Sequence, residues 1–153
     1  MEATFEAVRQ ALQADEPRYR QLASDFGTDA LPHLQKILAS EDSMLASKAV
    51  YLAGVIGSEA ATSIVQQGAA SADVIVRVAA TAAAAWMPSA HASEVLAPLV
   101  DDADVGVQKV ALRSVPESPS EYLMERVEAL RSGDASEIVK KESGAAMERV
   151  KKQ

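Results

Sequence analysis

Two histidines are the first candidates for chemistry, because imidazole acts as a general base and a metal ligand near neutral pH. His33 lies in DALPHLQ, which indicates the start of a helix, and His91 lies in SAHASE, which indicates a turn. A working metal site needs three or four converging ligands, and the chain has no cysteine to add to these two residues. We therefore expect two ordinary surface histidines and no metal site.

An acidic run, Asp101, Asp102 and Asp104, is the second candidate, because carboxylate oxygens bind calcium. The EF-hand loop requires oxygen ligands at alternating positions, a glycine at position six and a glutamate at position twelve. Counted from Asp102, position twelve is Arg113. The run therefore indicates an acidic turn between helices, with Asp104 beginning the next helix.

Covalent and phosphate chemistry also lack their motifs. No Gly-Lys pair occurs, so the phosphate-binding P-loop is excluded, and no Gly-x-Ser-x-Gly elbow presents a serine nucleophile. We expect no catalytic residues and no cofactor, and predict that the protein is not an enzyme.

The chain's charge and hydropathy restrict its partners further. Its net charge of −7 disfavours binding to a polyanion, so no nucleic-acid partner is expected. The sequence begins MEATFEAVRQ, without a basic stretch followed by an apolar run, and no segment approaches the roughly 20 apolar residues that cross a bilayer. We expect a cytoplasmic protein with no membrane association.

A 31-residue recurrence organises the middle of the chain. Asp42, Asp73 and Asp104 are equally spaced, and their neighbours recur with them. Apolar residues lie eight before, three after and seven after each aspartate: Leu34, Val65 and Leu96; Leu45, Val76 and Val107; Ala49, Ala80 and Ala111. Spacing of this kind is that of helices with one buried side, so each unit is predicted to be a helix pair.

Each aspartate is expected to be the N-cap of the second helix in its pair, because its carboxylate can accept from the unpaired N–H groups of the first turn. A fourth, degenerate unit is predicted from Val139, Lys140, Ser143, Ala146 and Val150, which repeat the spacing of the second unit with one residue inserted. Its first helix is predicted over 119–131, with Ser118 as cap, Pro119 at the first position and Glu121 as the reciprocal acid.

The fold predicted from these units is all-α and forms one domain over 1–153. Residues 1–28 form an N-terminal capping helix pair, 29–57, 58–88 and 89–116 form the repeats, and 117–153 form the degenerate C-terminal repeat. Solenoids need such ends because each unit buries its faces only against its neighbours.

The run DVIVRVAATAAAA at 73–85 resembles the Asp, Val, Arg and Ala signature of HEAT-like repeats of the phycobilisome-lyase type. The resemblance implies a right-handed α-α superhelix of about ten helices in about five antiparallel pairs. Arg77 and Lys140 match the family's arginine column, whereas Ala46 and Gln108 depart from it. Arg77 is expected to bridge one of the cap aspartates.

Second helices line the concave side of such solenoids, so residues at shared offsets after each cap should form columns there. The helix near 72–87 is apolar almost all round except for Asp73, Arg77 and Thr81, which indicates either central burial or a docking patch. Aromatic residues often anchor partners. The residues expected to bind a partner are Met44, Ser47, Tyr51, Val74, Val78, Trp86, Lys109 and Arg113.

Three functions follow as hypotheses. The leading one is an adaptor or scaffold that binds a helix or peptide of another protein on the concave face. A second is a lyase-like or chaperone-like accessory for a chromophore or cofactor, which only the family resemblance implies. The third is a self-assembling structural module, with a homodimer as its simplest form.

Overall fold

The protein is built from helices. The computed structural model describes residues 1–40 and 42–151, and no strand occurs in them, so the predicted all-α class is confirmed. The elements, in chain order, are α1 (Phe5–Leu12), α2 (Tyr19–Phe26), the short 3-10 helix η1 (Gly27–Ala30), α3 (Leu31–Ser40), α4 (Ser43–Ile56), α5 (Glu59–Ala69), α6 (Val74–Ala84), α7 (Ser89–Leu99), α8 (Val105–Arg113), α9 (Glu121–Ser132) and α10 (Glu137–Lys151).

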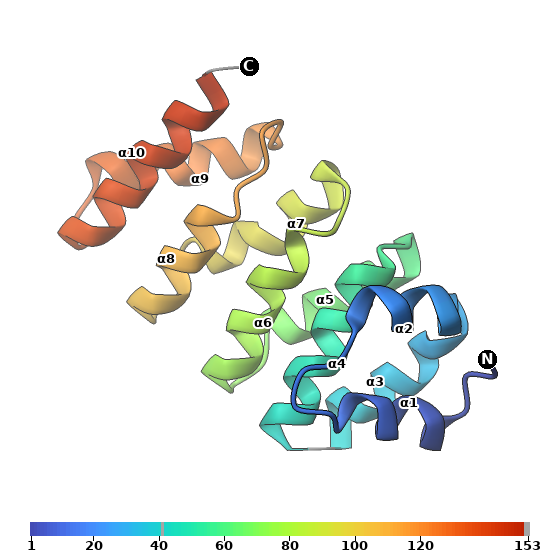
Figure 1. Cartoon of the computed structure of the whole chain (residues 1–153). Coiled ribbons are helices and arrows are strands. Elements are labelled where there is room, and N and C mark those ends of the chain that lie inside the picture. Colours follow the sequence, from blue (N-terminus) through green and yellow to red (C-terminus); the bar gives the residue numbers. More distant parts are fainter. Residues whose placement is uncertain (41, 152–153) are drawn as a thin grey trace.

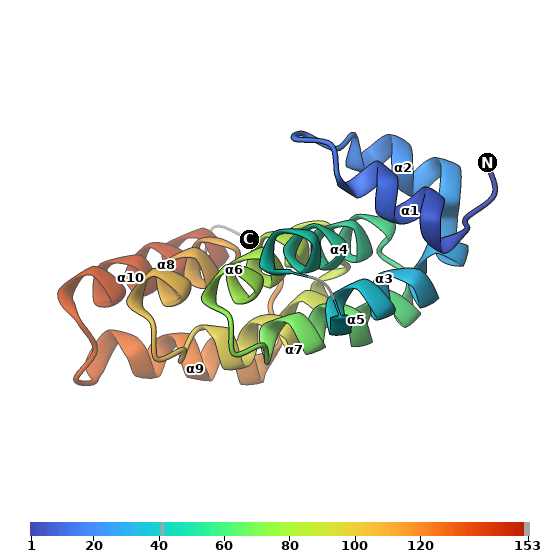
Figure 2. The ribbon, with the colours of Figure 1, turned by 90° about the horizontal axis from the view of Figure 1, so that it is seen from below.

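From α3 onward the helices lie in two layers (Figures 1 and 2). One layer contains α3, α5, α7 and α9, and the other contains α4, α6, α8 and α10. Each helix packs against its neighbours in its own layer and against its sequence partner in the other. We call the layer of α4, α6, α8 and α10 the second-helix layer.

The recurring columns of the sequence are the core between these layers. Leu34, Val65 and Leu96, from the first helix of successive pairs, are fully buried, as are Ala49, Ala80 and Ala111 from the second. In the fourth pair Val139, Ser143 and Ala146 are also fully buried. The spacing therefore predicts correctly which side of each helix is removed from water, which is the main stabilising term in such a fold.

The three recurring aspartates occupy the N-cap positions that the repeat predicts. Asp42 accepts from the backbone N–H of Leu45, and Asp104 accepts from that of Val107. Asp73 accepts from Ile75, and its second carboxylate oxygen accepts a hydrogen bond from the Ser43 hydroxyl. The beginning of α4 is thus linked to that of α6, and the Ser43 hydrogen bond is the largest cause that holds the pKa of Asp73 below its ordinary value.

Arg77 does not form its ion pair with a cap aspartate, so that expectation was wrong. Its guanidinium makes a two-point contact with Asp102, with Nε–Oδ2 and Nη2–Oδ1 distances of 2.9 and 3.2 Å. Arg77 also donates to the backbone carbonyls of Ser71 and Ala72. The carboxylate of Asp104 already accepts from the N–H of Val107 as the cap of α8, whereas that of Asp102 is within reach of Arg77. Arg77 therefore links the turn before α6, through Ser71 and Ala72, to the turn before α8, through Asp102.

The fourth unit begins later than predicted. The N-cap of α9 is Ser120, which accepts from Leu123 N, whereas Ser118 and Pro119 precede the helix. The physical reason lies in another helix: the backbone N–H of Ser120 donates to the hydroxyl of the buried Ser93 on α7 at 3.0 Å. This contact holds Ser120 in the extended backbone conformation of an N-cap.

The apolar helix α6 is buried on one side and exposed on the other, so central burial accounts for only part of its apolar surface. Val76, Ala80, Ala83 and Ala84 are buried, but Val74 and Ile75 are 39% and 48% exposed. Thr81, one of the three polar exceptions in this helix, is fully buried and donates to the carbonyl of Val78. The buried side needs small residues, because a Cβ at Gly54 of α4 would lie 2.6 Å from the Cβ and carbonyl oxygen of Ala83.

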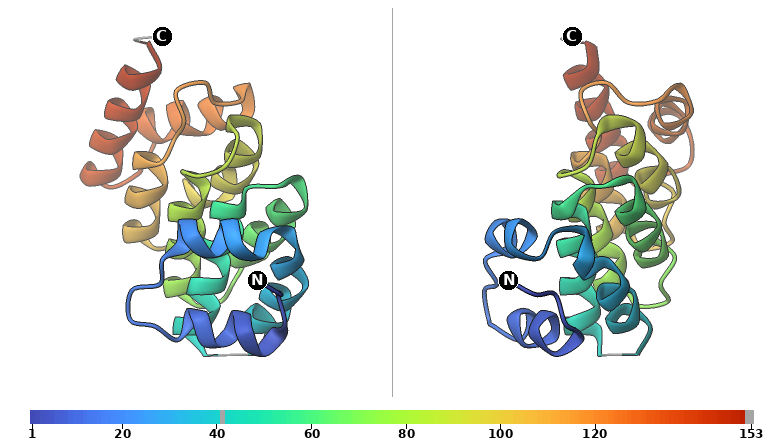
Figure 3. Two further views of the ribbon diagram at one scale, coloured as in Figure 1. Left: turned by 45° about the vertical axis from the view of Figure 1, so that its right-hand side comes forward. Right: turned by 90° about the vertical axis from the view of Figure 1, so that its right-hand side faces the viewer.

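The N-terminal pair stands apart from the two layers, on the side of the second-helix layer (Figures 2 and 3). Helix α2 packs against α4, and α1 contacts both α3 and α4. Gly27, with a φ of 59°, turns the chain from α2 into η1 and α3. Lys48 of α4 donates to the Ala14 carbonyl at 2.7 Å and so fastens the α1–α2 loop.

Candidate functional site

The predicted partner-binding residues lie on helices of the second-helix layer and at the end of α6. Met44, Val74 and Trp86 are 58%, 39% and 38% exposed, and Arg113 is also exposed. Ser47, Tyr51, Val78 and Lys109 are half-buried. These positions differ from the core columns in their distance along the sequence from the cap. Their side chains reach solvent, and successive helices therefore share a common outer face.

An exposed apolar row runs along one edge of this face. It consists of large apolar side chains in the first turns of the second-layer helices: Met44, Val74, Ile75, Val105 and Ile138. Three of them, Ile75, Val105 and Ile138, are not among the predicted partner-binding residues. Met44 and Ile75 lie two residues after their caps, but on α8 that position is Gly106, and Val105 before it supplies the apolar side chain instead. We call this set the apolar row.

The same face carries positive charge in an acidic protein. Helices α4, α6 and α8 contain four cations and no aspartate or glutamate within their bounds, although the chain has a net charge of −7: Lys48, Arg77, Lys109 and Arg113. Arg113 contacts Glu142 of α10 at 2.7 Å, and this hydrogen bond lowers the pKa of Glu142. Arg77 is likewise paired with Asp102, and an aspartate cap directly precedes each of the three helices. Within the described residues, only Lys48 and Lys109 of these four cations lack an ion pair.

Tyr51 and Trp86 form the centre of an aromatic cluster. The indole Nε1 of Trp86 donates to the Tyr51 hydroxyl at 2.6 Å, and the two rings meet edge to face with centroids 6.4 Å apart. Tyr19 of α2 packs edge to face on Tyr51 with a centroid distance of 4.6 Å. Partial burial, and secondarily the nearby Tyr51, raise the pKa of the Tyr19 phenol above its ordinary value of 10.0.

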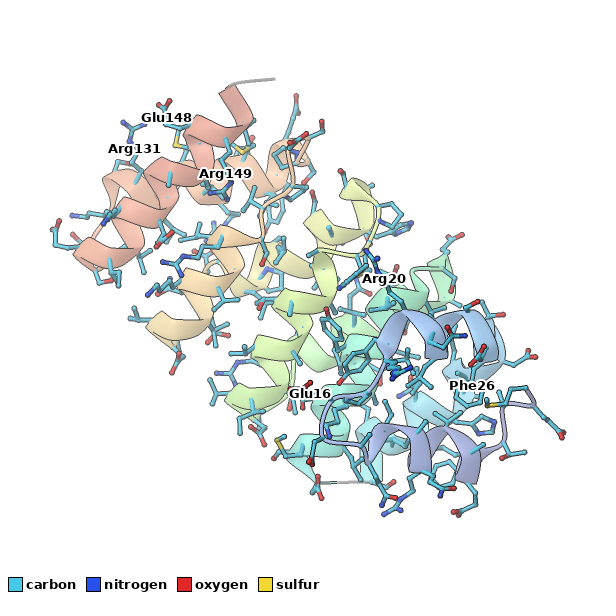
Figure 4. All side chains as sticks on the ribbon, viewed as in Figure 1. Glu16, Arg20, Phe26, Arg131, Glu148 and Arg149 are labelled. Carbon is cyan, nitrogen blue, oxygen red and sulfur yellow. The ribbon has the colours of Figure 1, made fainter. Side chains whose placement is uncertain are left out.

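A basic residue completes this cluster from the N-terminal pair. The guanidinium carbon of Arg20 lies 4.9 Å from the Trp86 ring centroid, which is a cation–π contact. Figure 4 shows Arg20 at the end of α2 that faces the middle of the molecule, whereas Phe26 lies at the other end of the helix. Together these elements border a pocket of about 490 Å³ that is open to solvent. It is lined by Arg18, Tyr19, Arg20, Gln21, Tyr51 and Trp86. We call it the arginine–aromatic pocket.

The pocket residues on α2 were not identified from the sequence. Tyr51 and Trp86 fall in or near the repeating columns, but Arg18, Tyr19 and Arg20 precede the first repeat and share none of its spacing. The available signal was local: an aromatic residue between two arginines at the start of a helix. Only the position of α2 over α4 brings this triplet to Tyr51 and Trp86.

The two histidines are not the surface residues that were expected. Both are half-buried, and the Nδ1 atom of each is buried without a hydrogen bond in the described residues. His33 packs edge to face on Phe5, and His91 lies inside α7 rather than in a turn. No group of three or more His, Asp or Glu side chains within residues 1–40 and 42–151 is arranged to hold a metal ion.

Comparison with known proteins does not assign the chain to a family. The sequence matches no protein-family model and no curated protein. Among the helices described above, none is long and apolar enough to cross a membrane. Function is therefore inferred below from the second-helix layer and the arginine–aromatic pocket.

Proposed function

We propose that the protein is an adaptor that binds a helix or extended segment of a partner protein on the outer face of the second-helix layer. In this proposal the two layers form a HEAT-like right-handed superhelix of antiparallel helix pairs, and the outer face of the second-helix layer is its concave side. The 31-residue recurrence, the three aspartate caps and the layered packing support this assignment.

The apolar row is the observation that carries the proposal. Its five large side chains are between 39% and 58% exposed, although helices in the same layer bury other valine and leucine side chains completely. Single exposed apolar residues are ordinary, but a contiguous set of them usually marks an interaction surface. Cations on α8 lie beside this row and would supply the polar rim of an interface.

An affinity-capture experiment tests the proposal. Wild type is compared with Ile75→Asp, Val78→Asp and Trp86→Ala as baits in extracts of cells that express the protein. Ala60→Asp, on the exposed side of α5 in the other layer, is the matched control. We expect the same proteins with wild type and Ala60→Asp and their loss with Ile75→Asp. Equal recovery by all folded variants would remove the site.

Self-association is the competing use of the same apolar row. A second copy would bury Met44 and Ile75 and leave less of the face for a partner. Light scattering over a wide concentration range distinguishes the two, because an adaptor with an open face keeps a monomer mass. A dimer that dissociates in Ile75→Asp but not in Ala60→Asp would favour the structural module.

A further inference from the structure

We infer that the arginine–aromatic pocket recognises an acidic amphipathic segment of the partner, with a carboxylate bound by Arg18 and Arg20. The inference rests on the proposed function and adds the chemistry of the partner to it. It commits to a peptide segment whose acidic residues enter the pocket and whose apolar residues continue along α4 toward the apolar row.

Two arginines without a carboxylate partner are the first support. Arg18 and Arg20 are both exposed, and neither forms an ion pair with any residue that the structure describes. By contrast, Arg77, Arg113 and Arg126 each contact an aspartate or glutamate. The contact of Arg20 with the Trp86 ring restricts the side chain but does not neutralise it. A guanidinium held in this way is suited to binding a carboxylate with two hydrogen bonds.

The shape of the pocket is the second support. It is open to solvent rather than enclosed, with a volume of about 490 Å³, so a segment can lie across it at the surface. Tyr19, Tyr51 and Trp86 form its apolar walls and are held by ring contacts and by the Trp86–Tyr51 hydrogen bond. Fixed aromatic walls beside two cations provide both an apolar contact and a charged contact for one segment.

Charge complementarity selects an acidic segment over a basic one. The pocket is lined by Arg18 and Arg20 and by no aspartate or glutamate. Helix α4, which continues from it, contains Lys48 and no acidic residue within its bounds. A lysine-rich segment would therefore meet like charge, which opposes binding. The apolar row distinguishes a peptide from a nucleic acid, because Met44 and Ile75 need apolar side chains opposite them and a sugar–phosphate backbone has none.

The length of the segment also follows from the helices. Tyr51 lies at the pocket and Met44 in the apolar row on the same helix, seven residues apart, which is roughly 10 Å along the axis at 1.5 Å per residue. Two turns of a partner helix cover this distance. The segment therefore needs an acidic residue near one end and apolar residues one and two turns away.

Three synthetic helical peptides test the inference. They share the same leucine positions and contain no tryptophan or tyrosine, and their polar positions are all glutamate, all glutamine or all lysine. Trp86 is the single tryptophan of the chain, so its emission reports directly on the pocket. We expect the glutamate peptide to shift this emission and to bind about tenfold more tightly than the glutamine peptide. Its affinity should fall as salt rises from about 20 to about 500 mM.

Variants assign the effect to the two arginines. Arg18→Gln/Arg20→Gln should weaken the glutamate peptide about tenfold while leaving the glutamine peptide unchanged. Lys36→Gln, which removes an exposed cation from α3 in the other layer, is the matched control and should bind both peptides as wild type does. Circular dichroism establishes that each variant is folded, which is expected because these side chains are exposed.

Several outcomes would overturn the inference. They are equal binding of the glutamate and glutamine peptides, tighter binding of the lysine peptide, no response of Trp86 to the glutamate peptide at about 1 mM, and displacement of that peptide by an oligonucleotide of equal charge. The proposed function can be tested separately from this inference. A captured partner that is lost with Ile75→Asp but retained with Arg18→Gln/Arg20→Gln would support the adaptor and contradict only the recognition of an acidic segment.

Discussion

The indole Nε1 of Trp86 donates a hydrogen bond of 2.6 Å to the hydroxyl of Tyr51, 35 residues earlier in the chain. This bond joins the interior of α4 to the segment that follows α6, its neighbour in the second-helix layer. The bond also holds the two aromatic rings together. Tyr19 and Arg20 of the N-terminal pair pack against Tyr51 and Trp86, respectively. The position of α2 is thus coupled to the environment of a single fluorophore.

Tyr51→Phe removes the acceptor and keeps the ring. We expect it to change the emission maximum of Trp86 and to lower the free energy of unfolding by at most about 1 kcal/mol, because both side chains are partly exposed. Steady-state fluorescence and urea unfolding measure the two effects. Tyr122→Phe, at a tyrosine that is 62% exposed, should change neither quantity. An unchanged Trp86 spectrum in Tyr51→Phe would contradict the bond.

High pH is expected to loosen α2 from the stack. Burial raises the pKa of Tyr19 above 10.0, so folding favours the neutral phenol. The stabilisation from Tyr19 is therefore complete below its ordinary pKa and is lost as pH rises through the raised value in the folded protein. A pH titration of Trp86 emission should show a transition above pH 10.0 that is smaller in Tyr19→Phe. A transition of equal size in both proteins would exclude Tyr19 as its cause.

The core could be predicted from the sequence because burial in stacked helix pairs depends mainly on residue spacing. Leu34, Val65 and Leu96 recur at one interval and are all buried. The caps could also be predicted, because a cap is a local contact between an aspartate and the next turn of the chain. Features that depend on contacts between residues distant in the sequence could not be predicted in this way. The hydrogen bond from Ser120 to Ser93 displaced the start of α9.

The candidate site could be predicted only in part, for the same physical reason. Tyr51, Trp86 and the residues on α6 and α8 lie within the repeating units, so their exposure followed from their offsets after the caps. Arg18 and Arg20 precede those units, and the turn at Gly27 decides where they lie. No local pattern in the sequence specifies that α2 packs against α4 beside Tyr51 and Trp86.

The ion pair between Arg77 and Asp102 should contribute more to stability than a surface pair. Their side chains are 18% and 9% exposed, and Arg77→Met would leave the Asp102 carboxylate largely buried without its cation. We expect a loss of about 3 kcal/mol. Arg113→Met is the control, because Arg113 is 56% exposed in its contact with Glu142 and its loss should reduce stability much less. Urea unfolding monitored by circular dichroism compares the two, and equal losses would contradict the difference in burial.

The close approach of α4 and α6 gives the sharpest test of how the layer is packed. An added Cβ at Gly54 would lie 2.6 Å from both the Cβ and the carbonyl oxygen of Ala83, and 2.8 Å from its Cα. Backbone atoms cannot yield as a flexible side chain can, so Gly54→Ala must push the two helices apart. We expect a loss of about 1 to 3 kcal/mol in the free energy of unfolding.

Gly144→Ala is the matched control for this substitution. Gly144 lies inside α10, and nothing is within 4 Å of an added Cβ there. Because alanine loses less backbone entropy than glycine in a helix, this variant should gain about 0.5 to 1 kcal/mol. Chemical unfolding curves of both variants should therefore move in opposite directions from wild type. Stabilisation of Gly54→Ala as well would contradict the close contact between α4 and α6. The adjoining aromatic pair, Tyr51 and Trp86, would then not be held in place by that contact.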